Sequence, residues 1–319
     1  MELKNINSVY FIGIGGIGMS ALARFYLSKG IAVGGYDKVC TPLTESLVKE
    51  GATISYSDEL SEISTSFKNT KTTFIVYTPA IPSSHKGYNY FKDNGFNIVK
   101  RSELLGLITD VLFTIGVAGT HGKTTTSSII THVLDNSGFP VNAFLGGISS
   151  NLNSNFLIND KAETVVVEAD EYDRSFLTLA PNIAIVTSMD ADHLDIYGEH
   201  SYLTESFEKY VVKLPSDGIL IKRKGLSVEH NNTIEYAVNE KADYYATNIN
   251  IENGEYHFDI VTPKETVKDV MLGMPGLHNV ENAVAAIVVG VELGISTALI
   301  VAALKSFKGV KRRFEYHIK

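Results

Sequence analysis

Residues 116–126 read Gly-Val-Ala-Gly-Thr-His-Gly-Lys-Thr-Thr-Thr, and this stretch decides how the middle of the chain folds. The apolar run Val111–Ile115 precedes it and predicts a buried strand, while Thr124–Leu134 follows it and predicts a helix. A glycine-rich turn between a strand and a helix directs unpaired backbone N–H groups at one point, where the helix N-terminus adds partial positive charge. The stretch therefore predicts a turn that binds phosphate.

Two side chains of this turn carry the expected chemistry. Lys123 would reach the β- and γ-phosphates of a nucleotide, and the hydroxyl of Thr124 would bind Mg²⁺. The strict pattern G-x-x-x-x-G-K-[ST] is missed by one residue, because Val117 stands in place of the first glycine. The alternative is a polar loop that contains Gly-Lys-Thr by chance, but the strand before it and the helix after it favour a nucleotide site.

A second glycine loop lies near the start of the chain, at Gly13–Gly18, and fits G-x-G-x-x-G. It follows a predicted strand, Val9–Ile14, and opens a predicted helix, Met19–Ser28. Asp37 ends the next predicted strand, Ala32–Tyr36, where an acid that binds ribose would lie. The loop by itself indicates a nucleotide or dinucleotide, with NAD as the first candidate. The alternative is that its glycines serve only tight packing.

The order of predicted elements indicates an α/β protein. Through residue 109, strands and helices alternate, which predicts a Rossmann-like parallel sheet with helices on both faces. The remaining elements predicted there are a helix at Pro42–Glu50, a strand at Phe74–Tyr77, a helix at Tyr88–Asn94, a strand at Asn97–Val99 and a helix at Ser102–Thr109 capped by Ser102. We expect domains at residues 1–108 and 109–311, with 312–319 beginning a linker.

The second predicted domain is an α/β domain of the phosphate-loop ATPase type with a small antiparallel β portion. The predicted buried strands are Val141–Leu145, Thr164–Val167 and Ile183–Thr187. Between Asp217 and Asp269 the pattern changes to short alternating pieces with Asn and Gly turns. Within it, a hairpin is predicted from Tyr244–Asn250 and Glu255–Val261, and helices follow at Asn279–Leu293 and Thr297–Ser306.

Composition excludes several classes of protein. The chain has 319 residues, enough for two domains, and a net charge of −8 argues against nucleic-acid and anionic-membrane partners. Cys40 is the one cysteine, so no internal disulfide can form, and we expect a reducing cytoplasm. No run reaches the length of a transmembrane helix, and the glycines within Val9–Met19 argue against a signal peptide.

Acidic and histidine side chains follow two of the later strands. Glu168 ends a predicted buried strand, where ligands bind in open parallel sheets, and we expect it to bind Mg²⁺. The alternative is a solvated acidic loop, since Asp170, Glu171 and Asp173 follow at once. His193 follows the strand that ends at Thr187 and could bind metal or orient a phosphate. The alternative for His193 is an ordinary hydrogen-bonded histidine.

Two amides and two arginines complete the candidates. Asn279 and Asn282 share one face of a predicted helix, and their carboxamides suit the edge of adenine. The alternative is that Asn279 caps that helix. Arg312 and Arg313 could clamp a phosphate, or they could simply be solvated.

Taken together and in order, these segments resemble the Mur ligase family of cell-wall precursor synthesis, whose loop commonly lacks the glycine replaced here by Val117. The segments that carry the resemblance are residues 11–20, 118–126, 168–173, 192–195, 278–283 and 312–315. The resemblance implies three domains, and this chain stops just past Arg313, where the third would begin. We therefore expect the chain to bind substrates without completing the reaction by itself.

The implied reaction joins L-alanine to the lactyl carboxylate of UDP-N-acetylmuramate through an acyl phosphate, with ATP and Mg²⁺. By resemblance the residues that bind the UDP sugar are Gly15, Gly16, Gly18, Asp37, Thr78, Ala80, Ile81 and Pro82. Those that bind ATP are Gly119, Thr120, His121, Gly122, Lys123, Thr124, Thr125, Asn279, Asn282 and Arg313. Thr124, Glu168 and His193 would hold the metal, and Lys123, Glu168, His193 and Arg313 would be catalytic.

More weakly, Gly146 and Gly147 resemble the stretch near the muramyl sugar. Three alternatives stay open: a murein-peptide recycling ligase of the same family, an NAD-dependent oxidoreductase that uses the first loop, and a non-catalytic nucleotide-binding module. The oxidoreductase leaves Lys123 and Glu168 unexplained. The recycling ligases have a different glycine loop.

Overall fold

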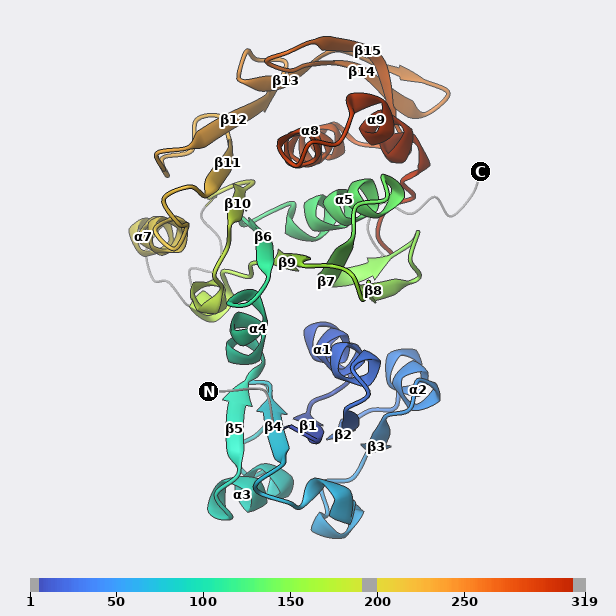
Figure 1. The fold of residues 1–319 in the computed structure, drawn as a ribbon, viewed down its shortest axis with the longest axis vertical. Coiled ribbons are helices and arrows are strands. Elements are labelled where there is room, and N and C mark those ends of the chain that lie inside the picture. Colours follow the sequence, from blue (N-terminus) through green and yellow to red (C-terminus); the bar gives the residue numbers. More distant parts are fainter. Residues whose placement is uncertain (1–5, 191–199, 312–319) are drawn as a thin grey trace. The chain divides into compact units, whose positions relative to one another are not determined.

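The computed structural model describes residues 6–190 and 200–311 (Figure 1). The chain folds into two compact units, which divide between Leu107 and Ile108. Each unit carries one of the two glycine loops. Among the described residues, no helix is both long enough and apolar enough to cross a bilayer.

The first unit contains a parallel sheet, as predicted. Over residues 6–107, five strands pair in the order β3-β2-β1-β4-β5, and every pair is parallel. The strands are β1 (Ser8–Ile12), β2 (Ala32–Tyr36), β3 (Thr53–Ser55), β4 (Thr73–Tyr77) and β5 (Asn97–Lys100). The helices are α1 (Ile17–Ser28), α2 (Pro42–Lys49), α3 (Lys86–Asp93) and α4 (Arg101–Thr109), with short 3-10 turns η2 (Leu60–Glu62) and η3 (Thr65–Phe67).

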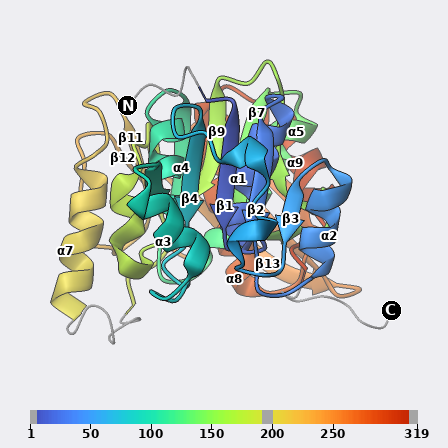
Figure 2. The ribbon, with the colours of Figure 1, turned by 90° about the horizontal axis from the view of Figure 1, so that it is seen from below.

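Alternation along β1 explains why helices cover both faces of this sheet. Phe11 points to the face where Tyr26 of α1 packs, with ring centroids 6.5 Å apart. Tyr10, its neighbour in sequence, points to the other face and packs against Phe67 and against Phe91 of α3. Helices α1 and α2 contact each other beside β1 and β2 (Figure 2). The first glycine loop joins β1 to α1 and therefore opens at the carboxyl edge of the central strand.

The second unit is built on one larger sheet. Over residues 108–190 and 200–311, ten strands pair in the order β15-β14-β13-β12-β11-β10-β6-β9-β7-β8. The strands are β6 (Phe113–Ala118), β7 (Val141–Ser149), β8 (Ser154–Leu157), β9 (Thr164–Glu168), β10 (Ile183–Val186), β11 (Ile219–Arg223), β12 (Thr233–Val238), β13 (Tyr244–Glu252), β14 (Glu255–Val261) and β15 (Thr266–Leu272). The pairs β7–β8, β13–β14 and β14–β15 are antiparallel and the rest parallel, so the predicted antiparallel portion continues the main sheet.

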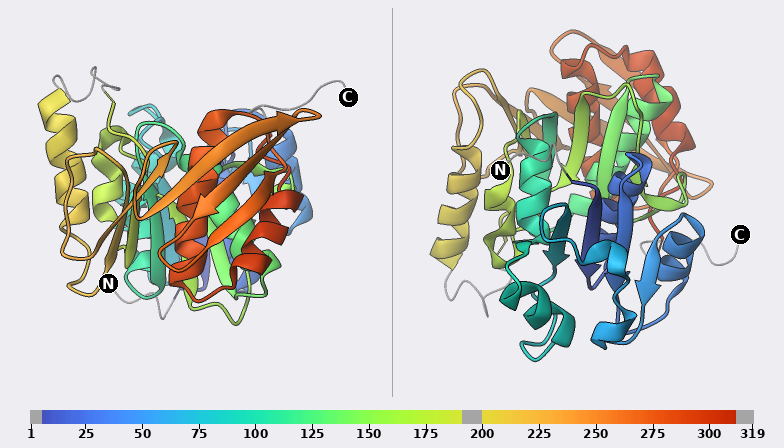
Figure 3. Two further views of the ribbon diagram at one scale, coloured as in Figure 1. Left: turned by 90° about the horizontal axis from the view of Figure 1, so that it is seen from above. Right: turned by 60° about the horizontal axis from the view of Figure 1, so that its bottom comes forward.

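Three helices bury one face of this sheet. They are α5 (Lys123–Asn136), α8 (Leu277–Glu292) and α9 (Thr297–Ser306), which contact one another. Their apolar side chains form one core with alternate residues of the strands, including Ile115 and Val117 of β6. The antiparallel strands β13–β15, orange in Figure 3, lie over α8 and α9. Helix α5 is buried from Thr124 to Leu134, which fixes the turn that precedes it.

The opposite face of β6 carries an aromatic cluster. It comes from η4 (Tyr172–Thr178) and α7 (His200–Val211), where Phe176 stacks on Tyr210 with ring centroids 5.1 Å apart. A Cβ built on Gly116 would lie 2.1 Å from the Tyr210 hydroxyl oxygen, so only glycine lets this ring lie against the strand. Burial raises the pKa of Tyr210, which keeps the phenol neutral.

The structure corrects several local predictions. Val111 and Phe113 are 75% and 40% exposed, so the buried strand before the phosphate turn starts later than predicted and continues to Ala118. Helix α4 begins at Arg101, which places Ser102 inside its first turn. The sequence analysis missed β3, β8 and α7, but the predicted hairpin is confirmed, with Asn253 and Gly254 at positive φ in its turn.

Candidate nucleotide-binding site

The turn between β6 and α5 has a backbone that requires glycine at two places. Gly119 has φ +137° and Gly122 has φ +84°, both in the region that favours glycine. A Cβ on Gly119 would lie 2.1 Å from Thr187 Oγ1, and a Cβ on Gly122 would lie 2.7 Å from Asn282 Oδ1. Gly122 is the N-cap of α5, and no described side chain hydrogen bonds to that cap. The predicted strand, turn and helix are therefore present, and they lead to a helix N-terminus without a side-chain cap, where an anion is favoured.

Two hydroxyl residues that the sequence analysis missed support this turn. Ser188 Oγ accepts the N–H of His121 at 2.8 Å and lies 2.9 Å from Thr120 Oγ1. Thr187 Oγ1 donates to the His121 carbonyl. Both follow β10, which pairs with β6, so strand pairing brings them to the turn. The sequence feature that could have indicated Thr187 and Ser188 is the change to polar residues at the end of a predicted buried strand.

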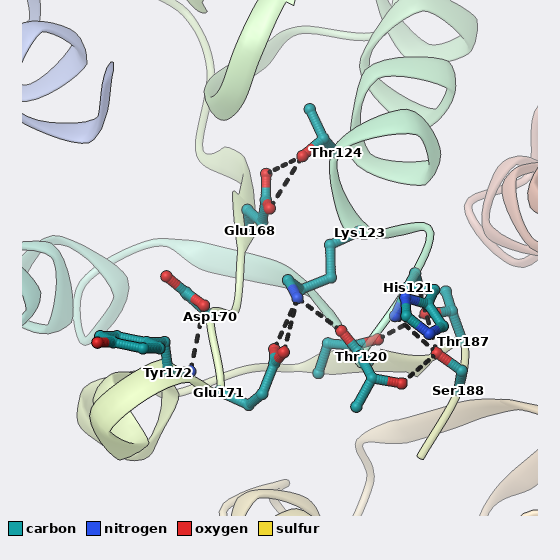
Figure 4. A network of polar contacts seen from close by, with 12 residues as sticks. Thr120, His121, Lys123, Thr124, Glu168, Asp170, Glu171, Tyr172, Thr187 and Ser188 are labelled. Atoms are coloured by element: carbon teal, nitrogen blue, oxygen red, sulfur yellow. Dashed lines mark hydrogen bonds and ion pairs between the residues drawn. The ribbon is translucent and has the colours of Figure 1, made fainter. Parts of the chain in front are cut away.

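Lys123 is paired with an acid in this structure. Its Nζ donates to the Gly119 carbonyl at 2.7 Å and lies 2.7 Å from Oε2 of Glu171 (Figure 4). The Glu171 side chain is fully buried and that of Lys123 is 13% exposed. The alternative of a solvated acidic loop is therefore wrong for Glu171. The ammonium lies against the turn, at the place where the sequence predicted phosphate recognition.

Thr124 is paired with the second acid of the same segment. Its hydroxyl lies 3.0 and 2.9 Å from the two carboxylate oxygens of Glu168, the last residue of β9 (Figure 4). A Cβ on Gly146 would lie 1.9 Å from Glu168 Oε2, so the carboxylate occupies space that any other residue there would fill. A hydroxyl and a carboxylate are the oxygen donors that Mg²⁺ prefers. The residues present thus fit that ion, and Gly146 borders the acid.

The two predicted amides are brought to the same turn from α8. Asn282 Oδ1 accepts the Thr126 hydroxyl at 3.0 Å, and its Nδ2 donates to Asn279 Oδ1 at 3.3 Å. Both side chains are buried, as is Thr125 in the first turn of α5. The N-cap of α8 is Gly276, so the alternative that Asn279 caps the helix is wrong.

The loop of the first unit is held by different side chains. Asp37 Oδ2 accepts the N–H of Gly15 at 2.7 Å, so this predicted acid reaches the loop. Gly13 has φ +90°, and a Cβ there would lie 2.5 Å from Cγ2 of Thr78, another predicted residue. A Cβ on Gly18 would lie 2.8 Å from Nη1 of Arg101, so a guanidinium lies across the loop. The sequence analysis missed Arg101.

The other predicted residues of the first unit lie in the turn after β4. Ile81 N–H donates to the Thr78 carbonyl at 3.2 Å, and Ile81 packs on the aromatic core of the unit. Ala80 and Pro82 are exposed. Gly16 is the N-cap of α1. His193 and Arg313 lie outside the described residues, so their predicted roles stay predictions.

The arrangement defines an α/β protein with a nucleotide-type phosphate turn, a buried lysine–glutamate pair and a hydroxyl–carboxylate pair. Family models match both units: "Mur ligase family, catalytic domain" at residues 8–111 and "Mur ligase middle domain" at residues 117–290. The chain belongs to the Mur ligase family, whose members depend on ATP and synthesise peptidoglycan precursors. The NAD-dependent oxidoreductase considered from the first loop alone is therefore wrong.

Individual relatives match between 96% and 100% of this chain. The UDP-N-acetylmuramate–L-alanine ligase of Christiangramia forsetii is 50% identical over all 319 residues, which correspond to 70% of its own length. The structure of the UDP-N-acetylmuramate–alanine ligase of Thermotoga maritima is 27% identical, with a TM-score of 0.85 over 98% of this chain and 71% of that one. The ligase for UDP-N-acetylmuramate and L-alanyl-gamma-D-glutamyl-meso-diaminopimelate from Neisseria meningitides has a TM-score of 0.84 at 24% identity, over 96% of this chain and all of that one, which shows a shared fold alone.

Proposed function

We propose that this chain binds UDP-N-acetylmuramate in its first unit and ATP in its second, and serves the ATP-dependent joining of L-alanine to the lactyl carboxylate of UDP-N-acetylmuramate. The observation that carries the proposal is the 50% identity with a ligase of that name over the entire chain. The paired side chains around the turn after β6, Lys123–Glu171 and Thr124–Glu168, support it, since a lysine suits phosphate and a hydroxyl with a carboxylate suits Mg²⁺.

In the proposed ATP site, the backbone of the turn and the ammonium of Lys123 receive the phosphates. Gly119, Thr120, His121 and Gly122 form the turn, and Thr124 and Thr125 open the helix that follows. Asn279 and Asn282 lie at the end of the turn and would support or contact the nucleotide.

We further propose that Thr124 and Glu168 hold Mg²⁺, joined by His193. When bound, this ion would neutralise charge on the phosphate oxygens. The Thr124 hydroxyl lies within 3.0 Å of both Glu168 carboxylate oxygens, so oxygen donors from two residues lie together. Gly146 leaves the space that the Glu168 side chain fills.

In the proposed UDP-sugar site, the glycines of the first loop, Gly15, Gly16 and Gly18, approach the diphosphate. Asp37 orients the loop through the Gly15 N–H and would bind ribose. The turn from Thr78 through Ala80, Ile81 and Pro82 would border the uridine, and the Arg101 guanidinium supplies positive charge beside Gly18.

The chemistry explains why the protein needs so many charge-stabilising groups. A carboxylate is a poor electrophile, so it is first phosphorylated, and the amine of L-alanine then attacks the acyl phosphate and releases phosphate. The first step brings two anions together. Lys123, the N–H groups of the turn and the proposed Arg313 would lower that repulsion as charge develops in transfer.

Titration calorimetry tests the binding part of this proposal on the chain itself. We expect heat with UDP-N-acetylmuramate and, separately, with AMP-PNP in the presence of Mg²⁺, and none with NADH. The enzyme expressed from its complete gene is then assayed for phosphate release that requires both UDP-N-acetylmuramate and L-alanine. Release with L-alanyl-γ-D-glutamyl-meso-diaminopimelate and not with L-alanine would replace our assignment by the recycling ligase.

A further inference from the structure

The contact between Lys123 and Glu171 joins two segments that are distant in sequence. Lys123 is the first residue of α5, and Glu171 is the N-cap of η4, three residues beyond the end of β9. The two charged groups approach to 2.7 Å. Thr124 and Glu168 form a second contact between the same segments (Figure 4). Two consecutive helix residues thus contact two acids that lie three residues apart.

The backbone around Glu171 presents this acid in one conformation. The Tyr172 N–H donates to Asp170 Oδ1 at 3.2 Å, and the Phe176 N–H donates to the Asp170 carbonyl at 2.9 Å. The Arg174 N–H donates to the Glu171 carbonyl at 2.9 Å. These bonds fix the backbone at Glu171, and the burial of its side chain keeps the carboxylate beside Lys123.

The position of the ammonium follows from its second partner. Lys123 Nζ also donates to the carbonyl of Gly119, which is part of the phosphate turn itself. An ammonium has three N–H donors, and these two acceptors use two of them. The third is then available to a phosphate oxygen, without loss of either existing bond.

The alternative is that Glu171 holds Lys123 away from a bound nucleotide, and the burial of Glu171 argues against it. The Glu171 side chain is fully buried, so a departing lysine would separate this carboxylate from an ammonium 2.7 Å away at a place shielded from water. Phosphate binding by a lysine that stays paired avoids this penalty. The arrangement therefore favours a lysine that serves the carboxylate and the phosphate together.

We propose that Glu171 is a positioning residue for Lys123: it holds the ammonium at the phosphate turn, so that little side-chain freedom is lost when ATP binds. This inference rests on the proposed ATP site. It assigns to Glu171 a role that acts through Lys123 and therefore concerns the β- and γ-phosphates, and not the nucleoside.

The test compares nucleotides that differ in these phosphates. Calorimetric titrations use AMP-PNP with Mg²⁺, and AMP, on the wild-type chain and on Glu171→Gln, which keeps the shape but removes the charge. We expect AMP-PNP binding to weaken about tenfold, the effect of one charge-assisted hydrogen bond, and AMP binding to change less than about twofold. Asp170→Asn is the matched control, since it removes a charge from the same turn but keeps the Oδ1 that accepts the Tyr172 N–H, and both affinities should stay near wild type.

A mutant cycle tests whether Glu171 acts through the lysine. In a Lys123→Met background, adding Glu171→Gln should leave AMP-PNP affinity unchanged and should raise the melting temperature, because a buried charge separated from its lysine is replaced by a neutral amide. Unchanged or tighter AMP-PNP binding by Glu171→Gln, equal weakening of AMP, or the same loss in the Lys123→Met background would each overturn the inference. Absence of AMP-PNP binding by the well-folded wild-type chain would instead overturn the proposed ATP site.

Discussion

The two glycine loops of this protein share one backbone device and differ in the side chains around it. In both, a central parallel strand leads into a helix through a turn that contains glycine at positive φ, Gly13 in the first loop and Gly119 and Gly122 in the second. Asp37 and Arg101 contact the loop at Gly13–Gly18. The turn at Gly119–Gly122 lies instead beside two side-chain pairs, Lys123–Glu171 and Thr124–Glu168. The first set suits holding a diphosphate, and the second suits moving a phosphate.

The backbone pattern shared by the two loops is typical of phosphate recognition but does not specify the chemistry. Residues contributed by other strands decide that. The first loop in isolation is compatible with NAD, and what distinguishes the two sites is a lysine, a hydroxyl and two acids around the second loop. Four substitutions test this difference between the two loops, and their expected effects decrease in order.

The largest effect is expected from Lys123→Met. Loss of the ammonium should lower ATP-dependent phosphate release by the complete enzyme by at least about 10²-fold, as for other preorganised transition-state contacts. UDP-N-acetylmuramate binding, measured by calorimetry, should stay within about twofold if the first unit works separately. Because breaking a buried ion pair costs about 3–5 kcal/mol, the fold is checked by circular dichroism and against Lys123→Met/Glu171→Gln. Near-normal phosphate release would contradict the assignment of the second loop.

The next effect is expected from Gly146→Ala. The added methyl would meet Glu168, whose Oε2 lies 1.9 Å from the new Cβ position, so the acid must turn away from Thr124. We expect the Mg²⁺ concentration for half-maximal activity to rise about tenfold, the scale of disturbing the support of a metal ligand. Gly138→Ala is the control. It places an alanine at a backbone with φ +76°, which is strained, but its Cβ would have no other atom within 4 Å. An equal rise in both variants would show that general destabilisation is responsible.

A smaller effect is expected from Arg101→Met in the first unit. Its guanidinium lies beside Gly18, and losing it should weaken UDP-N-acetylmuramate binding about five- to tenfold, as for one charge-assisted contact. The loss should shrink at high salt, since screening weakens the wild-type contact as well. Lys100→Met, an exposed neighbour, is the matched control. AMP-PNP binding should not change in either variant, and a change there would break the separation of the two loops.

The smallest effect concerns the helix behind the second loop. His132 of α5 is buried against α9, where Nε2 lies 3.0 Å from the Ala303 carbonyl, and burial lowers the pKa of its imidazole. A lowered pKa means that the unfolded chain binds the proton more tightly, so this contribution to stability is complete above about pH 6.5 and is lost as the pH falls below it.

Chemical denaturation between pH 7.5 and 5.5 measures this effect. In His132→Gln the part of the pH slope that comes from this group should vanish, and for one proton that part is at most about 1.4 kcal/mol per pH unit. The signal should come from the second unit, to which α5 belongs. An identical slope in the variant would show that another group titrates.

Much of the fold could be predicted because the patterns are local. Glycine spacing, apolar alternation and helix periodicity predict strands, turns and helices within short windows, and the α/β class with its parallel sheets followed. Short edge elements such as β3 and β8 were missed, because three or four residues carry little periodicity. Val111 and Phe113 are exposed because β6 begins only at Phe113, and no local pattern predicts the residue at which the strand enters the sheet.

The sequence by itself determined which residues could do phosphate chemistry: two glycine loops, a lysine and a threonine at a helix start, and acids at a strand end. Only the tertiary structure decided the pairing. Glu171 meets Lys123 across 48 residues, and Ser188 meets His121 across 67, because β9 and β10 flank β6 in the sheet. Strand order is a global property, set by how the whole core packs, so these partners become visible only in the fold.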